Sequence, residues 1–403
     1  MIKYYFSKFR NILFLIIISV LFGLIRNIVL GRMLTKYDFG IYALSLTVIG
    51  MLYPILIFGQ QRGLVRFFVS HKIEEYNWRK PISVLINISF VLSMIIVPSI
   101  TWYYQMNSAF TCFCILAILS SIICELLSNL VRSSKKYELA IFLQRALRVI
   151  LSILAIVFFL FDIDSLEILF IVFGITHIIY GFLLYYYVRL IIKSGNTKIP
   201  NYLFTQGLHF FLMDIAGLTY VYGVNIFIVG LISVEALGAF FAISIILRIF
   251  EMFTQSTDFI VMPASGELDY HSILSIIGKT FLIGVFLSLF FIVYGRDLLS
   301  ILYNQKYDTY LDLIPYVAII GLIKIIDVVP SSIISGAFNS NVLKRYLNIN
   351  ITLPVILIPL SIVLIRSIAL KGAMVSLIVF YLLKVVFGYS IFINRNNSYL
   401  KTD

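Results

Sequence analysis

About twelve long apolar runs, each of roughly twenty residues, follow one another along the chain. Each run is long enough for an α-helix to cross the hydrocarbon core of a bilayer, which is about 30 Å thick. The runs are continuous and do not alternate between polar and apolar residues, which excludes the strands of a membrane barrel. Hydrophobic residues make up 61% of the 403 residues and charged residues only 12%, too few for the surface of a soluble protein. The sequence therefore predicts an all-α membrane protein.

The mean hydropathy of +1.02 supports the same class. The predicted spans cover residues 11–31, 39–59, 82–103, 109–131, 138–160, 166–188, 206–231, 236–262, 273–294, 310–337, 345–365 and 369–393.

The basic residues indicate which ends of the spans face the cytoplasm. With a cytoplasmic N-terminus, about nineteen of the 31 lysines and arginines fall in inner segments and about six in outer ones. An outer loop instead collects acids, as in "FDIDSLE". This bias predicts that both termini are cytoplasmic and that the number of spans is even. It also accounts for the net charge of +12, so nucleic acid is not an expected partner.

The middle of the chain suggests two halves. The polar stretch "IIKSGNTKIPNYLFT" is typical of a linker and separates residues 1–195 from residues 196–403. "LTKYDFGIYALS" and "ISVEALGAFFAIS" share an acid, a glycine and an aromatic residue before a new span, with Gly40 and Gly238 in matching places. We therefore expect two six-helix lobes around a central cavity, related as parallel repeats.

One predicted span contains several ionisable residues. In "ISIILRIFEMFTQSTDFIVMP", the helical period places Ser244, Arg248, Glu251, Gln255 and Asp258 on one face. A charge at the bilayer centre costs at least ~2.5–3.5 kcal/mol, so this face should contact protein or water. Two interpretations remain open: ion pairs that lock helices together, or a hydrated cavity with a net cationic wall.

Other spans carry similar groups. Under the ion-pair interpretation, Arg248–Glu251 and Lys324–Asp327 have the i, i+3 spacing of self-neutralising pairs. Arg26 has no acid three or four residues away, which makes it the best candidate for contact with a ligand. Arg145 and Arg148 are expected to extend toward a span end.

No metal site is predicted. Cys112, Cys114 and Cys124 lie inside an apolar stretch without matching ligands nearby, and are interpreted as packing residues. His177 and His209 are interpreted as packing or hydrogen-bonding residues of the spans. No nucleotide-binding motif is visible, so direct use of ATP and any cofactor are not expected.

Several motifs, in order and over nearly the whole chain, resemble the polysaccharide transporter family. They are "GRMLTKYDFGIYALS", "FGQQRGLVRFF", "LSNLVRSSKKYELAIFLQRALRVILSILAI", "SVEALGAFFAISIILRIFEM" and "SILYNQKYDTYLDLIPYVAIIGLIK", the last with Asn304 where the family usually has glycine. These proteins are flippases for lipid-linked O-antigen and capsule repeat units, within the multidrug/oligosaccharidyl-lipid/polysaccharide exporter superfamily. The resemblance implies a multi-pass protein of a bacterial inner (plasma) membrane, with two six-helix lobes around a cationic cavity that opens alternately to each side.

The first span, "FGLIRNIVLGRML", is also similar to that of lipid II flippases. That resemblance implies that Arg26 binds a pyrophosphate, with Arg248 as its partner because Val20 stands where a second arginine is usual. The implied cargo is a glycan on a polyprenyl pyrophosphate, and arginine suits phosphate because its planar fork donates two hydrogen bonds.

The sequence thus predicts a non-enzymatic flippase whose partners are this glycan lipid, membrane lipid and other polysaccharide-assembly proteins. The expected site residues are Arg26, Arg248 and Lys324 for substrate; Ser244, Gln255 and Asn225 for the polar cavity wall; and Asp214, Glu251 and Asp258 for a coupling ion. The driving force stays open between H⁺, Na⁺ and the membrane potential.

Three alternatives stay open. The same acids would suit an exporter of drugs or organic cations. A membrane polymerase or glycosyltransferase would need larger outer loops for acid–base chemistry. A structural partner in an envelope assembly would not require charges along so many helix faces.

Overall fold

The chain is almost entirely helical in the computed structural model, which describes residues 2–199, 202–265, 270–337 and 340–399. Within these residues there is no strand, and the β-type pairing is one isolated bridge between Tyr76 and Thr197. The all-α prediction is confirmed. Helices suit a bilayer because each one satisfies its own backbone N–H and C=O groups.

The contacts divide the chain into two compact units, which are described one at a time. Unit 1 consists of Met1–Leu34 and Ile41–Leu218, and unit 2 of Thr35–Gly40 and Thr219–Asp403. The expected lobe limits, 1–195 and 196–403, stay a prediction.

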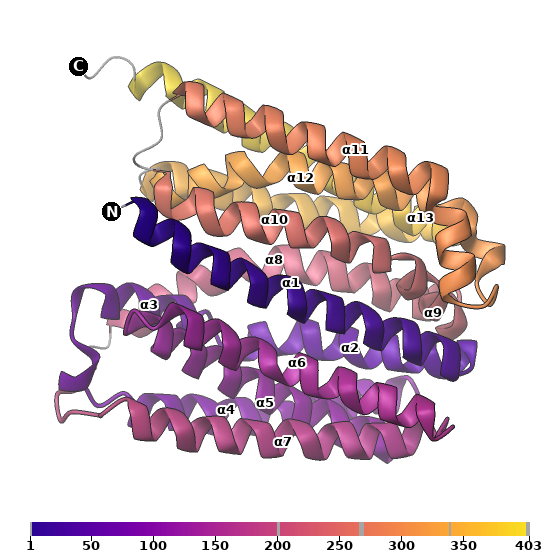
Figure 1. Ribbon diagram of the computed structural model, residues 1–403, viewed down its shortest axis with the longest axis horizontal. Helices are drawn as coiled ribbons and strands as arrows, with labels where there is room; N and C mark the ends of the chain where they lie inside the picture. Colours follow the sequence, from indigo (N-terminus) through magenta and orange to yellow (C-terminus); the bar gives the residue numbers. More distant parts are fainter. Residues whose placement is uncertain (1, 200–201, 266–269, 338–339, 400–403) are drawn as a thin grey trace. The chain divides into compact units, whose positions relative to one another are not determined.

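The helices (Figure 1) are α1 (Ile2–Met33), α2 (Lys36–Leu56), α3 (Gln60–Ser70), α4 (Arg79–Tyr103), α5 (Ser108–Ser133), α6 (Tyr137–Leu160), α7 (Leu166–Ile191), α8 (Tyr202–Leu231), α9 (Val234–Ile243), α10 (Ile245–Ala264), α11 (Tyr270–Leu302), α12 (Ile314–Ala337) and α13 (Ser340–Tyr399), with the short 3₁₀ helices η1 (Ile73–Glu75) and η2 (Asp308–Leu313).

The helices coincide with the predicted spans. Among the described residues, nine helices are long and apolar enough to cross a membrane, or ten if α9 and α10, bent by 48° at Ser244, form one span. The helix α13 contains two predicted spans. Its backbone leaves the helical conformation at Ile368 and Ala369, where the eleventh span was expected to give way to the twelfth.

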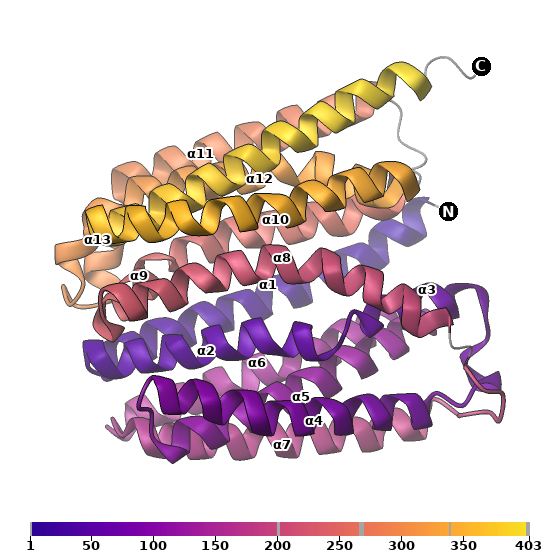
Figure 2. The same ribbon diagram turned by 180° about the vertical axis from the view of Figure 1, so that it is seen from behind.

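In unit 1, α5 packs along α7 and α1 packs along α6. Figures 1 and 2 both show α5 beside α7. Between these two helices, the rings of Phe113 and Phe170 stack with centroids 4.9 Å apart. A Cβ on Gly181 of α7 would lie 3.4 Å from the Cα of Ser120, so the small residue allows a close approach. Small residues and aromatic contacts are what hold membrane helices together in lipid.

The helix α3 was not predicted, because its residues fall between the predicted spans 39–59 and 82–103. This helix has only 11 residues, too short to cross a bilayer. It buries Leu64, Phe67 and Phe68 and packs on α5. A short helix with one apolar face gives no long hydrophobic run, so span counting cannot find it.

Two connections at one end of unit 1, residues 71–78 and 192–199, are tied together. Three backbone hydrogen bonds of 2.8–3.1 Å join them, and Trp78 is fully buried beneath. A Cβ on Gly195 would lie 2.2 Å from the carbonyl oxygen of Glu75, so only glycine fits there. The predicted linker therefore begins as an ordered part of unit 1.

In unit 2, α12 lies among α10, α11 and α13 and is mostly buried (Figures 1 and 2). Gly321 of α12 faces the ring of Phe250, 2.5 Å from where a Cβ would stand. The hydroxyl of Tyr220 on α8 hydrogen-bonds the hydroxyl of Ser361 on α13 at 2.8 Å. The helix α12 therefore forms the core of this unit.

The first turn of α2, Thr35–Gly40, belongs to unit 2, although the rest of α2 lies in unit 1. A Cβ on Gly40 would lie 2.1 Å from a backbone oxygen of α9, and a Cβ on Gly238 would lie 3.0 Å from the nitrogen of Gly40. Phe39 is fully buried, with its ring 5.8 Å from that of Phe241. The matching glycines of the two similar motifs therefore touch backbone to backbone. The repeat relation between the two halves stays a prediction.

Candidate functional site

Three of the predicted site residues meet in unit 2. Glu251 of α10 accepts a hydrogen bond from Arg248 at 2.9 Å on one oxygen and from Lys324 of α12 at 2.7 Å on the other. The Lys324 ammonium also lies 5.4 Å from the centre of the Tyr381 ring, within cation–π range. The Arg248 side chain is 51% exposed, and those of Glu251 and Lys324 are 23% and 19% exposed. The single carboxylate of Glu251 therefore balances part of the positive charge of both Arg248 and Lys324.

The expected pair between Lys324 and Asp327 is wrong. Lys324 bonds to Glu251, and Asp327 pairs instead with Lys384 of α13 at 2.8 Å. The expected Arg248–Glu251 pair is present. Helix spacing identified possible partners within one helix, but neighbouring helices offered other partners. The observed pairs tie α12 to α10 and to α13.

The remaining predicted polar residues of unit 2 are spread over α8 to α10. Asp258 accepts a hydrogen bond of 2.5 Å from the hydroxyl of Ser332. Ser244 lies at the bend between α9 and α10, and its buried hydroxyl has no hydrogen-bond partner within the described residues. Asn225 is partly buried on α8, and Gln255 is exposed on α10. Their roles in a cavity wall or in coupling stay predictions.

The helix α8 also carries Asp214 and His209, whose side chains lie outside the described residues. The interpretation of His209 as a packing residue and of Asp214 as a coupling group therefore stays untested. His177 on α7 is buried.

Arg26 of α1 lies in unit 1 and is partly buried. Its Nε atom is buried and has no hydrogen-bond partner in the part of the chain that the structure describes. No ion pair of Arg26 is seen among those residues either. A guanidinium placed in this way is able to bind an anion without first giving up a carboxylate.

Two further arginines of unit 1, Arg145 and Arg148, lie on α6 and were expected to extend toward a span end. Arg148 instead stands at the middle of α6, and Arg145 lies one turn earlier. The side chain of Arg148 lies against α1, since a Cβ on Gly23 would be 3.2 Å from its Cδ atom. Gly23 is about one turn from Arg26 on the same helix. Guanidinium-bearing side chains from α1 and α6 therefore share one region of unit 1, which we name the arginine cluster (Arg26, Arg145, Arg148).

The acid near this cluster is Glu125 of α5. Its two carboxylate oxygens accept hydrogen bonds of 2.8 Å from the side-chain amides of Asn129 and Gln144. Glu125 also attracts Arg145 electrostatically. Among the described side chains in the middle parts of α1, α5, α6 and α7, three arginines therefore stand against one acid.

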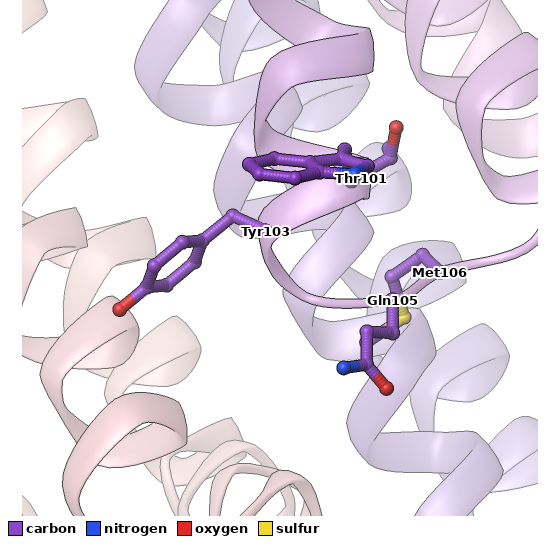
Figure 3. Close-up of a pocket in the computed structure, with 5 residues that line it drawn as sticks. Thr101, Tyr103, Gln105 and Met106 are labelled. Carbon is purple, nitrogen blue, oxygen red and sulfur yellow. The ribbon is translucent and has the colours of Figure 1, made fainter.

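A pocket of about 470 Å³ lies at the far end of α4 (Figure 3). It is lined by Thr101, Trp102, Tyr103, Gln105 and Met106. Trp102 and Tyr103 are 83% and 71% exposed, as is usual for aromatic side chains at a membrane–water interface. None of the predicted site residues lines this pocket, so it is a separate feature of the helix end.

The described residues contain no group of three or more His, Cys, Asp or Glu side chains that could hold a metal ion. Cys112, Cys114 and Cys124 are free thiols, the first exposed and the other two buried.

No family model and no curated protein matches the sequence. Solved structures do match. An inward-facing multidrug resistance MATE family transporter of the MOP superfamily has a TM-score of 0.67 at 12% identity, with 96% of each chain covered. The eukaryotic MATE transporter AtDTX14 has a TM-score of 0.64 at 16% identity, covering 96% of this chain and 95% of its own. The chain has the MATE transporter fold.

A third similar structure is a MOP superfamily transporter from Pyrococcus furiosus. It has a TM-score of 0.67 at 12% identity, covering 97% of this chain and 95% of its own, and is described by a binding pocket of reverse polarity that suggests a different function. The predicted fold class, helices in two lobes as in these transporters, is confirmed. The chain is thus a multi-pass membrane protein, and the three similar structures named above are those of transporters.

Proposed function

We propose that the protein is a flippase that moves polyprenyl-pyrophosphate-linked oligosaccharide repeat units across the membrane by alternating access. The observation that carries this proposal is Arg26 of unit 1, whose buried Nε has no hydrogen-bond partner among the described residues and which lies in the arginine cluster. A buried guanidinium that can still donate hydrogen bonds is suited to an anionic cargo.

The chemistry of such a cargo supports the assignment. A diphosphate cannot cross about 30 Å of hydrocarbon alone, because burying an unpaired ion costs many kcal/mol. Guanidinium groups replace its water with pairs of directed, charge-assisted hydrogen bonds. The resemblance of "FGLIRNIVLGRML" to lipid II flippases adds independent support for Arg26. Arg248 and Lys324 remain proposed substrate contacts, with the reservation that Glu251 already compensates part of their charge.

An exporter of organic cations is the second candidate, because two similar structures are MATE transporters, one of them named for multidrug resistance. A cation site needs acids that are available to the ligand. In unit 2 Glu251 and Asp327 are paired with cations, and Asp258 bonds to Ser332. The reverse polarity reported for the Pyrococcus furiosus transporter indicates that one fold can house pockets of either sign.

The remaining parts of the proposal concern place and energy. We propose a bacterial inner membrane with both termini in the cytoplasm, partners among polysaccharide-assembly proteins, and coupling to H⁺ or Na⁺ through Asp214, Glu251 or Asp258. The proposed glycan is a repeat unit of O-antigen or of capsule.

The decisive experiment uses purified protein in proteoliposomes with a fluorescent polyprenyl-pyrophosphate disaccharide under imposed H⁺ or Na⁺ gradients. We expect the label to change leaflet only when the protein is present, and an organic cation such as tetraphenylphosphonium not to be exported. Export of the cation without movement of the glycan lipid would establish the second candidate instead. No movement of either substrate would contradict both.

A further inference from the structure

Glu125 is an acid inside a membrane helix that the proposed transport function does not explain. Its carboxylate is fixed from two helices: Asn129 belongs to the same helix, α5, and Gln144 belongs to α6, with donor–acceptor distances of 2.8 Å. The amide of Asn129 also bonds to the backbone oxygen of Glu125 at 2.8 Å. Two neutral amides therefore set the position and direction of this carboxylate.

These hydrogen bonds place the Glu125 carboxylate near the arginine that follows Gln144 on α6. Gln144 directly precedes Arg145, so the bond from Glu125 to Gln144 brings the carboxylate to the turn of α6 that carries Arg145. Glu125 and Arg145 attract each other. Both hydrogen bonds of the carboxylate come from neutral amides, so they do not neutralise its negative charge, which still acts on Arg145.

We propose that Glu125 is an internal counter-ion of the arginine cluster, which compensates Arg145 while no cargo is bound and is replaced there by the anionic headgroup of the cargo. This inference rests on the proposed function, since it names how the same site is regulated. The ligand class is a diphosphate on a lipid.

The physical reason is the need to release the cargo. Three fixed arginines in a low-dielectric interior repel one another and attract a diphosphate strongly. A fixed carboxylate lowers the mutual repulsion in the empty state and repels the bound anion. It therefore weakens binding of the anion, and a transporter gains turnover when it does not bind its cargo too tightly.

The test measures binding of farnesyl diphosphate, a short lipid diphosphate, to the full chain in nanodiscs of neutral lipid. Glu125→Gln keeps the shape of the side chain and removes the charge. We expect this variant to bind the probe at least threefold more tightly than the wild type and to flip the glycan lipid more slowly. Farnesol, which lacks the diphosphate, should bind all variants equally.

A double-mutant cycle assigns the effect to the right arginine. Arg145→Gln should weaken binding, and the gain from Glu125→Gln should disappear when Arg145 is already replaced. Glu167→Gln is the matched control, because Glu167 is also an acid held by an amide, that of Asn107 at 2.9 Å, but lies exposed at the start of α7. It should leave binding unchanged. If Glu125→Gln fails to fold, Glu125→Asp, which draws the charge back by one methylene, should give a smaller gain.

The outcomes separate this inference from the proposed function. If the wild type binds the probe and Glu125→Gln binds it equally or more weakly, or if the gain persists without Arg145, the counter-ion role is overturned and the flippase proposal stands. If the wild type binds tetraphenylphosphonium but no diphosphate, both proposals are overturned.

Discussion

Unit 1 and unit 2 both place charged side chains inside membrane helices, but they balance them differently. In unit 2, Arg248, Lys324 and Lys384 each have a carboxylate partner at 2.7–2.9 Å. In unit 1, the arginine cluster stands against Glu125, whose oxygens bond to two amides. Matched ion pairs hold neighbouring helices in place, whereas surplus cations are costly and are retained where a ligand needs them. From this difference we propose a mainly structural role for the Lys384–Asp327 pair of unit 2 and a binding role for the arginine cluster of unit 1.

The largest effect is expected where a matched pair of unit 2 is broken. Lys384→Met leaves Asp327 unpaired, and the Asp327 side chain is only 9% exposed. Removing one member of a buried pair costs about 3 kcal/mol, so we expect a loss of that size in the free energy of unfolding in detergent. The double replacement Lys384→Met with Asp327→Leu should regain most of it. Equal unfolding free energies of the single variant and the wild type would show that the pair does not stabilise the fold.

A smaller loss of stability is expected where the first turn of α2 meets α9. Gly238→Ala places a methyl group 2.7 Å from the backbone oxygen of Lys36, and Gly40→Ala one still closer to α9. Overpacking of backbone against backbone should cost about 2 kcal/mol, read as a lower melting temperature. Gly230→Ala on α8 is the control, because no atom lies within 4 Å of the added methyl group. A similar drop in all three variants would rule out the close approach as the cause.

Replacing Arg26 should lower the transport activity without lowering the stability of the protein. Arg26→Gln in unit 1 should lower the flipping rate at least tenfold, equivalent to about 1.4 kcal/mol, because a direct contact with the diphosphate is lost. Its unfolding free energy should equal or exceed that of the wild type, since the variant removes a charge that has no ion pair among the described residues. Arg32→Gln, near the end of the same helix, should flip normally, and Arg248→Gln should lose less activity than Arg26→Gln. A wild-type flipping rate in Arg26→Gln would contradict the proposal that unit 1 binds the diphosphate.

The smallest effect is expected at the exposed pair of unit 2. Lys371 and Asp312 lie 2.7 Å apart, but their side chains are 49% and 45% exposed. Water and salt screen such a pair, so Asp312→Asn should change the unfolding free energy only slightly, and far less than Lys384→Met does. The measurement is repeated at high salt, where the small difference should vanish. A change as large as that for Lys384→Met would mean that burial does not decide the value of these pairs.

Span positions could be predicted because the bilayer alone sets them. An apolar run of about twenty residues must be helical whatever its neighbours are. The break at Ile368 and Ala369 fell where one run ended and the next began. The helix α3 could not be found in this way, since its burial depends on contact with α5 rather than with lipid.

The partners of the charged groups were harder to predict. Sequence spacing marked Arg26 as lacking an acid on its own helix, and no ion pair of Arg26 is seen in the described residues. The same rule gave Lys324 the wrong partner, because Glu251 on a different helix is the one it contacts. Arg148 was expected at a span end and lies mid-helix against Gly23. In each case the deciding contact joins two helices, and spacing along one helix does not contain it.

Because the first turn of α2 packs in unit 2, its contacts form between residues that are synthesised far apart in time. Phe39 and Gly40 are made early, yet the residues that enclose them, Gly238 and Phe241, emerge from the ribosome about 200 residues later. A single cut of the chain before Thr219 therefore does not separate the two units, since the piece from Thr219 onward would lack the buried Phe39 and Gly40. Unit 2 can therefore complete its packing around Phe39 and Gly40 only after Gly238 and Phe241 have been synthesised.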